Sequence, residues 1–131
     1  MSNNHENCLR KVLKVIDILQ QRAEEKEERF EGCDRPFLGR NIENRICFNT
    51  RPVMLFMKNG NELKVDMEHG EETVFRVEKV FDNCVKLRVL KENKKTKEKH
   101  HRFKETKEFI TVNICCIGAI KCLDDVILEN L

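Results

Sequence analysis

The sequence predicts an α+β protein in which an N-terminal helix is followed by an antiparallel β-sandwich or barrel-like sheet of about six to seven strands. Three observations support this fold class. Apolar residues recur at helical spacing near the N-terminus, later segments alternate apolar and polar residues, and short turn signals separate those segments. The chain has 131 residues, of which 40% are hydrophobic, so we expect a single domain with one core over residues 1–131.

The helix is predicted over residues 1–30. Asn3 and Glu6 have the spacing of a capping pair, and Gly32 follows the mixed-charge run of residues 24–29 as a stop signal. Two sets of apolar residues recur at helical spacing: Leu9, Val12, Leu13, Ile16 and Leu19, and beside them Cys8, Val15 and Ile18. The second set makes the apolar stripe wider than one core contact needs. The helix therefore either binds a partner on its second side or lies deeply within its own domain.

A β-rich core is predicted over residues 36–131. Its first clear element is the short apolar run 53–57, which the Asn59-Gly60 pair follows directly. This pair is a strong turn signal, and residues 63–67 then alternate apolar and polar side chains. These segments predict a β-hairpin.

A second hairpin is predicted from residues 73–81 and 84–90, which flank Asp82-Asn83. A polar stretch then runs from Lys91 to Lys107 and is expected to form a loop. The apolar residues after it predict a further strand over residues 109–117.

Charge and hydropathy limit the classes of partner. With 25 basic and 23 acidic residues the formal net charge is only +2, so no overall field attracts the chain to nucleic acid or anionic lipid. No apolar run approaches the roughly 20 residues that span a bilayer, and the N-terminal residues lack the order of a signal peptide. We therefore expect a soluble protein on the cytosolic side of its cell, with no membrane partner.

The chain has seven cysteines, and no two of them form a CxxC pair. Because structural zinc sites take paired ligands at such short spacing, we predict no metal site. On a strand, Cys115 and Cys116 would point to opposite faces. Cys116 shares its face with apolar residues and is predicted to be buried, whereas Cys115 is predicted to face outward.

The other cysteines are assigned from their positions. Those at ends or turns of elements are predicted to be exposed: Cys8, Cys33, Cys47 and Cys122. The burial of Cys84 stays open. The alternative is that all seven are small core residues, as free cysteine often is.

Nothing in the sequence indicates catalysis. The four histidines, His5, His69, His100 and His101, lie in polar segments where no cysteine partner is evident, and there is no phosphate-binding loop or metalloprotease motif. We predict no catalytic residue, no enzymatic activity and no cofactor. The basic run 94–104 contains one aromatic residue, Phe103, so a solvated loop is favoured over a nucleic-acid site. The alternative function is a cytosolic adaptor or binding module that uses this loop for nucleic acid or an acidic protein.

Several segments resemble the CotY/CotZ-type spore coat and exosporium proteins of endospore-forming bacteria. In chain order they are Cys8 to Gln20, Pro36 to Gly39, Asn49 to Gly60, Val74 to Glu78, Cys84 to Leu90 and Ile110 to Val126. The resemblance implies a structural protein that is synthesised in the mother-cell cytoplasm and assembles on the spore surface. Its implied partners are further copies of itself and other spore coat proteins, joined by intermolecular disulfides.

The resemblance also bears on individual residues. Cysteines are expected in that family at Cys8, Cys33, Cys84, Cys116 and Cys122. Gly118 stands where a further cysteine is expected, and residues 91–107 are more charged than expected, which implies fewer cross-links or a different place in the layer. From their predicted exposure, the cross-linking candidates are Cys8, Cys33, Cys115 and Cys122, with Cys47 and Cys84 less certain.

Overall fold

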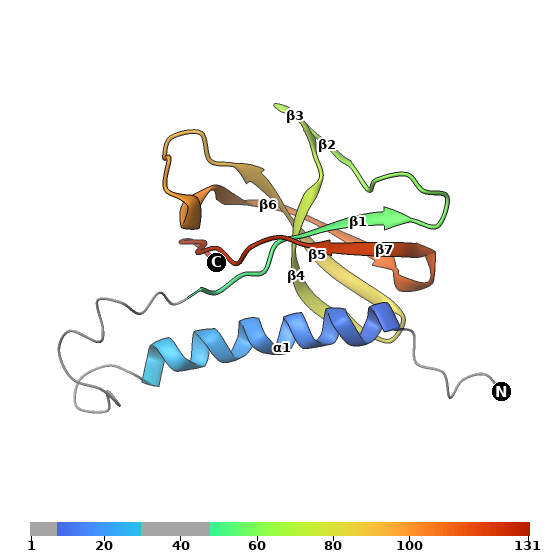
Figure 1. Cartoon of the computed structure of the whole chain (residues 1–131), viewed down its shortest axis with the longest axis horizontal. Helices are drawn as coiled ribbons and strands as arrows, with labels where there is room; N and C mark the ends of the chain where they lie inside the picture. Colours follow the sequence, from blue (N-terminus) through green and yellow to red (C-terminus); the bar gives the residue numbers. More distant parts are fainter. Residues whose placement is uncertain (1–7, 30–47) are drawn as a thin grey trace.

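The computed structural model describes residues 8–29 and 48–131, with the side chains of residues 8–23 and 48–131. In these residues one long helix precedes seven strands and two short 3-10 helices (Figure 1). The elements are α1 (Cys8–Arg29), β1 (Val53–Met57), β2 (Val65–Met67), β3 (Gly70–Glu72), β4 (Val74–Phe81), β5 (Cys84–Glu92), η4 (Lys99–His101), β6 (Phe103–Asn113), η5 (Ile114–Cys116) and β7 (Ile117–Cys122). The predicted capping pair and Gly32 lie outside the described residues. In the part of the chain described, no helix is both long and apolar enough to cross a membrane.

The strands form one large antiparallel sheet and one small ribbon. The sheet has the order β6-β5-β4-β1-β7, and β2 pairs only with β3. A helix followed by an antiparallel sheet is therefore confirmed. Closure into a barrel is wrong, because β6 and β7 remain as the two edges of the sheet. A sandwich is not confirmed either, since among the strands of residues 48–131 only the β2–β3 ribbon lies outside the sheet.

The two predicted hairpins differ in outcome. The second is confirmed as β4 and β5, and Asp82 in its turn has a positive φ of 51°. The first is confirmed at its turn, where Gly60 has a φ of 88° that glycine adopts without strain. Its second strand, however, separates from β1 after a bridge between Phe56 and Glu62, because β4 takes the same side of β1 at Val53. β2 then pairs with β3 instead.

The strand predicted over residues 109–117 is shifted toward the N-terminus. β6 begins at Phe103 because its first residues pair with the end of β5, with Phe103 opposite Glu92, so the polar loop is shorter than predicted. β6 also ends early, at Asn113. The Asn113 side chain there accepts a hydrogen bond of 2.9 Å from the Cys115 amide and caps η5. Cys115 and Cys116 are therefore in a turn and not on a strand.

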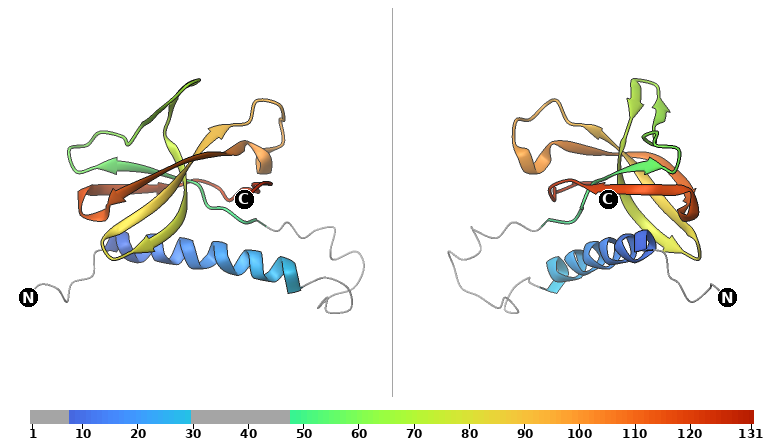
Figure 2. Two further views of the ribbon diagram at one scale, coloured as in Figure 1. Left: turned by 180° about the vertical axis from the view of Figure 1, so that it is seen from behind. Right: turned by 45° about the vertical axis from the view of Figure 1, so that its right-hand side comes forward.

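The main core lies between α1 and the sheet (Figure 2). Leu13 and Ile16 of α1 are at most 2% exposed and belong to the same buried cluster as Phe75 and Val77 of β4 and Leu87 of β5. Residues of the β1–β2 connection and β2 pack against this cluster. A second, smaller cluster joins β5 to the C-terminal segment through Leu90, Val126 and Leu128.

Gln20 connects α1 to the sheet through hydrogen bonds as well as packing. Its side chain is 4% exposed. The Nε2 group donates to the Val77 carbonyl of β4 at 2.7 Å, and Oε1 accepts from the Arg51 amide at 3.0 Å. One side chain thus satisfies a backbone acceptor and a backbone donor where β4 and the segment leading into β1 are not paired with each other.

We predict that Gln20→Ala lowers the free energy of unfolding by about 2 to 3 kcal/mol, because it leaves both backbone groups without a partner. Urea denaturation followed by circular dichroism measures this change. Gln21→Ala is the matched control, since Gln21 is exposed and its side chain bonds to Asp17 of the same helix, and it should change the stability by less than about 0.5 kcal/mol. Equal effects of the two substitutions would contradict the role assigned to Gln20.

Candidate functional site: thiols at one end of the sheet

The described residues contain five free cysteines, and four of them lie at the same end of the molecule. Cys8 begins α1, Cys84 begins β5, and Cys115 and Cys116 form part of η5. Figures 1 and 2 show that the start of α1, the β4–β5 turn and the β6–β7 connection lie side by side. We call this group of Cys8, Cys84, Cys115 and Cys116 the thiol end.

Two hydrogen bonds hold the three segments of the thiol end together at the β4–β5 turn. The Nε group of Arg10 in α1 donates to the Asp82 carbonyl at 2.7 Å. The Ile114 amide of η5 donates to the Asn83 carbonyl, also at 2.7 Å. The carbonyl of Cys116 further accepts a hydrogen bond of 3.0 Å from the Lys58 amide, which joins η5 to the end of β1.

The exposure of the thiols agrees with most of the predictions. Cys8, Cys115 and Cys122 are exposed, as predicted, and Cys84 is half-buried. The predicted burial of Cys116 is wrong, because this residue is exposed. The parity rule that placed it inside holds only on a strand, and the 3-10 turn at residues 114–116 buries Ile114 instead. Cys33 and Cys47 lie outside the described residues.

Cys122 lies apart from the thiol end, on the edge strand β7 opposite Val53. Near it, the Arg51 guanidinium donates to both Asp125 carboxylate oxygens, from Nε at 2.7 Å and from the terminal nitrogen at 3.1 Å. The hydrogen bond to Asp125 raises the pKa of Arg51, partial burial opposes this effect, and the charges of Asp125 and of the Cys122 thiolate add to it. A permanent positive charge therefore stands near Cys122.

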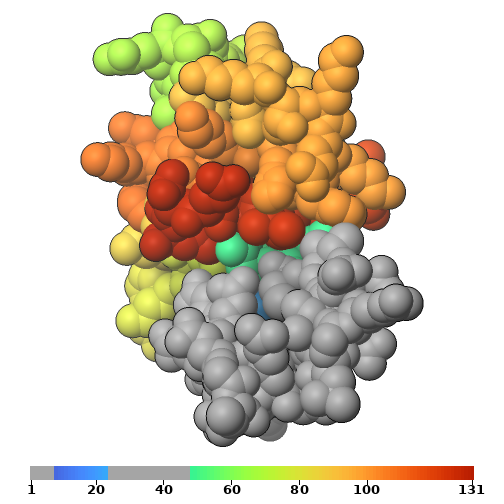
Figure 3. Space-filling model, turned by 90° about the vertical axis from the view of Figure 1, so that its left-hand side faces the viewer, coloured from blue at the N-terminus to red at the C-terminus, as the bar shows by residue number. Residues whose placement is uncertain are grey.

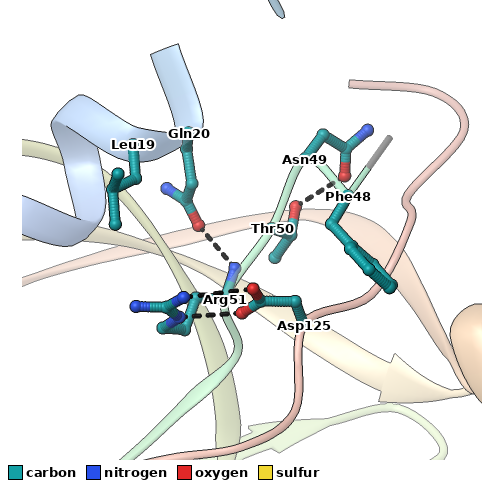
Figure 4. A pocket seen from close by; sticks show the side chains of 7 residues that line it. All are labelled: Leu19, Gln20, Phe48, Asn49, Thr50, Arg51 and Asp125. Atoms are coloured by element: carbon teal, nitrogen blue, oxygen red, sulfur yellow. Dashed lines mark hydrogen bonds and ion pairs between the residues drawn. The ribbon is translucent and has the colours of Figure 1, made fainter. Parts of the chain in front are cut away.

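A small cavity of about 150 Å³ lies beside this ion pair, between α1 and residues 48–51 (Figure 4). The polar side chains in its wall bond to one another or to the backbone. Gln20 bonds to Arg51, Arg51 bonds to Asp125, and the Thr50 hydroxyl donates to Asn49 at 3.0 Å. These groups hold α1, the start of β1 and the C-terminal segment together. We therefore interpret the cavity as a gap between packed segments and not as a ligand site.

The second apolar face of α1 is exposed. Val12, Val15 and Leu19 are 39%, 53% and 43% exposed, and together with Cys8 they follow a spacing of four, three and four residues along one stripe. We call these four residues the helix stripe. Ile18 is 44% exposed beside it. The possibility that the helix lies deeply within its own domain is therefore wrong for α1 as described, and a free second side remains.

The basic run 94–104 is partly attached to the C-terminal segment. The Ile127 amide donates to the His100 carbonyl at 2.8 Å, and the Arg102 guanidinium donates to the Asp124 carbonyl at 3.3 Å. Figure 3 shows the two segments in contact on one face of the molecule. The lysines at positions 94, 95, 97 and 99 remain exposed.

Over residues 8–29 and 48–131, no cluster of three or more potential ligands could hold a metal ion. None of the five cysteines in these ranges is hydrogen-bonded to a histidine. Two of the histidines lie beside carboxylates instead. His69 pairs with Glu72 in the β2–β3 ribbon. His101 has its Nε2 atom 3.9 Å from a Glu98 carboxylate oxygen and its Nδ1 atom 4.0 Å from a Glu129 carboxylate oxygen.

The exposed features define a class of protein: a small α+β fold with free thiols and an apolar helix stripe on its surface. The family described as spore coat protein Z matches residues 1–125. The chain belongs to this family, so the resemblance to CotY/CotZ-type proteins is confirmed, and its role is that of a structural protein of the spore coat. No curated protein and no solved structure matches the chain.

We predict that Cys8, Cys115, Cys116 and Cys122 react readily with a small alkylating reagent in the reduced native protein, and that Cys84 reacts more slowly because it is half-buried. Pulsed labelling followed by peptide mass spectrometry measures each rate. The most informative comparison is between Cys115 and Cys116. Because both are exposed, their alkylation rates should differ by no more than about threefold. Protection of Cys116 to the level of Cys84 would support the buried strand position and contradict η5.

Proposed function

We propose that this protein is a self-assembling subunit of the outer spore coat or exosporium, forming oligomers or two-dimensional lattices that intermolecular disulfides strengthen. The observation that carries this proposal is the thiol end. Three exposed thiols and one half-buried thiol lie on three segments at one end, and all five cysteines of the described residues are free. A surface that combines several unpaired thiols suits bonds to neighbouring chains.

The proposed chemistry follows the change of redox environment around a developing spore. The subunit is made in the reducing mother-cell cytoplasm, where its thiols stay reduced and contacts between chains are reversible. When the mother cell lyses, molecular oxygen accepts the electrons and protons of pairs of thiols, which become disulfides, and oxygen is reduced to water. Disulfides that form after assembly make the layer slow to dissociate.

The non-covalent contact is assigned to the helix stripe. Its spacing of four, three and four residues is that of a coiled-coil seam, so a second helix can pack along it. Burying an exposed valine or leucine contributes up to roughly 1.5 to 3 kcal/mol. We propose a cyclic arrangement of subunits in which the α1 helices meet at the centre of a ring. Heterologous contacts between rings then extend the rings into a layer. Cys8 lies at the end of the stripe, where a disulfide would stabilise the helix contact.

The cross-linking residues remain Cys8, Cys33, Cys115 and Cys122, with Cys47 and Cys84 less certain. Cys116 joins them, because it is exposed beside Cys115. Adjacent residues of a 3-10 helix point in directions about 120° apart. Cys115 and Cys116 are therefore suited to different neighbouring chains.

We predict that air-oxidised protein forms a ladder of multimers, or fails to enter the gel, in detergent electrophoresis without reductant, and collapses to the 15.6 kDa monomer on reduction. Negative-stain microscopy of the same native samples should show rings or sheets. A monomer band in both lanes together with empty grids would contradict self-assembly. That result would favour the adaptor that uses the 94–104 loop.

Replacing Cys8, Cys33, Cys115, Cys116 and Cys122 by serine should keep the fold and abolish the resistance of oxidised assemblies to boiling in detergent. The reason is that the exposed thiols supply the intermolecular bonds. Gel electrophoresis after boiling measures the loss. Cys84→Ser should lose less resistance than Cys8→Ser, Cys115→Ser or Cys122→Ser, because Cys84 is half-buried. Unchanged resistance of the five-serine protein would refute these assignments.

Replacing Val15 and Leu19 by lysine should raise the concentration needed for assembly under reducing conditions by at least about tenfold, because charges then occupy the apolar seam. Both residues are exposed, so the monomer should remain folded by circular dichroism. Asp17→Asn combined with Gln21→Lys adds the same charge elsewhere on α1 and should have little effect. Equal losses in the two proteins would show that net charge, and not the stripe, controls assembly.

A further inference from the structure

The outer face of β4, β5 and β6 carries an exposed group of cations and aromatic rings. On this face Phe81 lies opposite Cys84, Lys79 lies opposite Lys86, and Arg88 lies opposite Phe109. Phe81 and Phe109 are 37% and 38% exposed, and both lysines are exposed. We call Lys79, Phe81, Lys86 and Phe109 the basic face.

The basic face contains a repulsion between like charges that no carboxylate within residues 48–131 offsets. Like charges directly opposite each other on neighbouring strands are destabilising, and Lys79 and Lys86 form such a pair. Over residues 48–131 neither lysine has a carboxylate within ion-pair distance. Arg76 and Arg88, the neighbouring pair of like charges, do have a compensating carboxylate. Glu78 accepts hydrogen bonds from both, at 2.8 and 3.1 Å. A local conflict of this kind is common where a surface has a function.

The aromatic rings hold the cations in place. The Lys79 ammonium lies 5.8 Å from the centre of the Phe81 ring, and the Lys86 ammonium lies 4.8 Å from the centre of the Phe109 ring. The Arg88 guanidinium is 4.5 Å from the same ring. Because cations occupy the ring faces, stacked nucleic-acid bases would have to displace them. A partner segment with several carboxylates fits this face, because it can pair with the ammonium groups of Lys79 and Lys86.

The chain contains such a run in α1, where the sequence places Glu24, Glu25, Glu27 and Glu28 in the last turns of the helix. This run does not reach the basic face of its own chain. The bond from Arg10 to Asp82 holds the start of α1 at the β4–β5 turn, and residues 24–28 lie about 20 to 27 Å further along the helix axis. Figure 1 shows the two ends of α1 on opposite sides of the molecule.

We propose that the basic face binds the acidic last turns of α1 from a second copy of this chain. The proposal rests on the self-assembly proposed above and names a second contact for it. The contact is heterologous, since different surfaces of the two copies meet, and it leaves a free acidic run at one end and a free basic face at the other. This contact can therefore connect rings of subunits into a two-dimensional layer, and it is separate from the contact along the helix stripe.

The test is a charge exchange in the full-length protein under reducing conditions, with assembly followed by light scattering and negative-stain microscopy. The variant Lys79→Glu/Lys86→Glu should need at least about tenfold more protein to assemble, and about 0.5 M NaCl should weaken wild-type assembly. The variant with lysine at positions 24, 25, 27 and 28 should show the same loss. An equal mixture of the two variants should assemble again, because each then offers the charge that the other lacks.

Lys94→Glu/Lys97→Glu is the control, since it makes the same charge change on exposed lysines of the 94–104 loop. It should leave assembly unchanged. If wild-type protein and the Lys79→Glu/Lys86→Glu variant assemble equally well, the basic face is not a contact. This inference then fails, while the proposed self-assembly still holds. Losses in both variants without recovery in the mixture would also overturn it. A wild-type protein that stays monomeric refutes the proposed function itself.

Discussion

The position of α1 on the sheet depends on Gln20 and on the apolar residues one and two turns before it. Leu13 and Ile16 bury the helix in the main core, and Gln20 binds the Val77 carbonyl and the Arg51 amide, so packing and hydrogen bonding select the same face of α1. Rotation or sliding of the helix would leave two backbone groups without partners in a buried place. The same constraint determines that the helix stripe faces outward and that Cys8 lies at the β4–β5 turn.

Other polar side chains join segments that are distant in sequence. The Asn49 side chain both donates to and accepts from the backbone of Leu128, at 2.8 and 3.0 Å, and so acts in place of a paired strand for the C-terminal segment. Arg51 and Asp125 join the same two parts of the chain. Such satisfied polar contacts favour one arrangement of the segments over alternatives with similar apolar burial. The regular layer proposed above requires a rigid subunit, because errors in orientation would accumulate from copy to copy.

The surface features of this spore coat protein have directions that suit assembly. Thiols gather at one end, an apolar stripe follows α1, and a basic face covers the outer side of β4, β5 and β6. Contacts that differ at different ends produce extended arrays, whereas a single self-complementary patch produces closed dimers. In the proposed assembly, reversible contacts would correct errors before oxidation, and disulfides between chains would then retain the arrangement.

The sequence by itself determined the elements that local patterns specify: the helix, the β4–β5 hairpin around Asp82-Asn83, the turn at Gly60, and the exposure of Cys8, Cys115 and Cys122. Only the tertiary structure decided what depends on pairing between distant segments. β4 takes the side of β1 that the first hairpin would have used, the end of β5 draws Phe103 into β6, and the Asn113 cap turns Cys116 outward. The thiol end and the basic face likewise arise from strand register, which brings together residues that no spacing in the sequence relates.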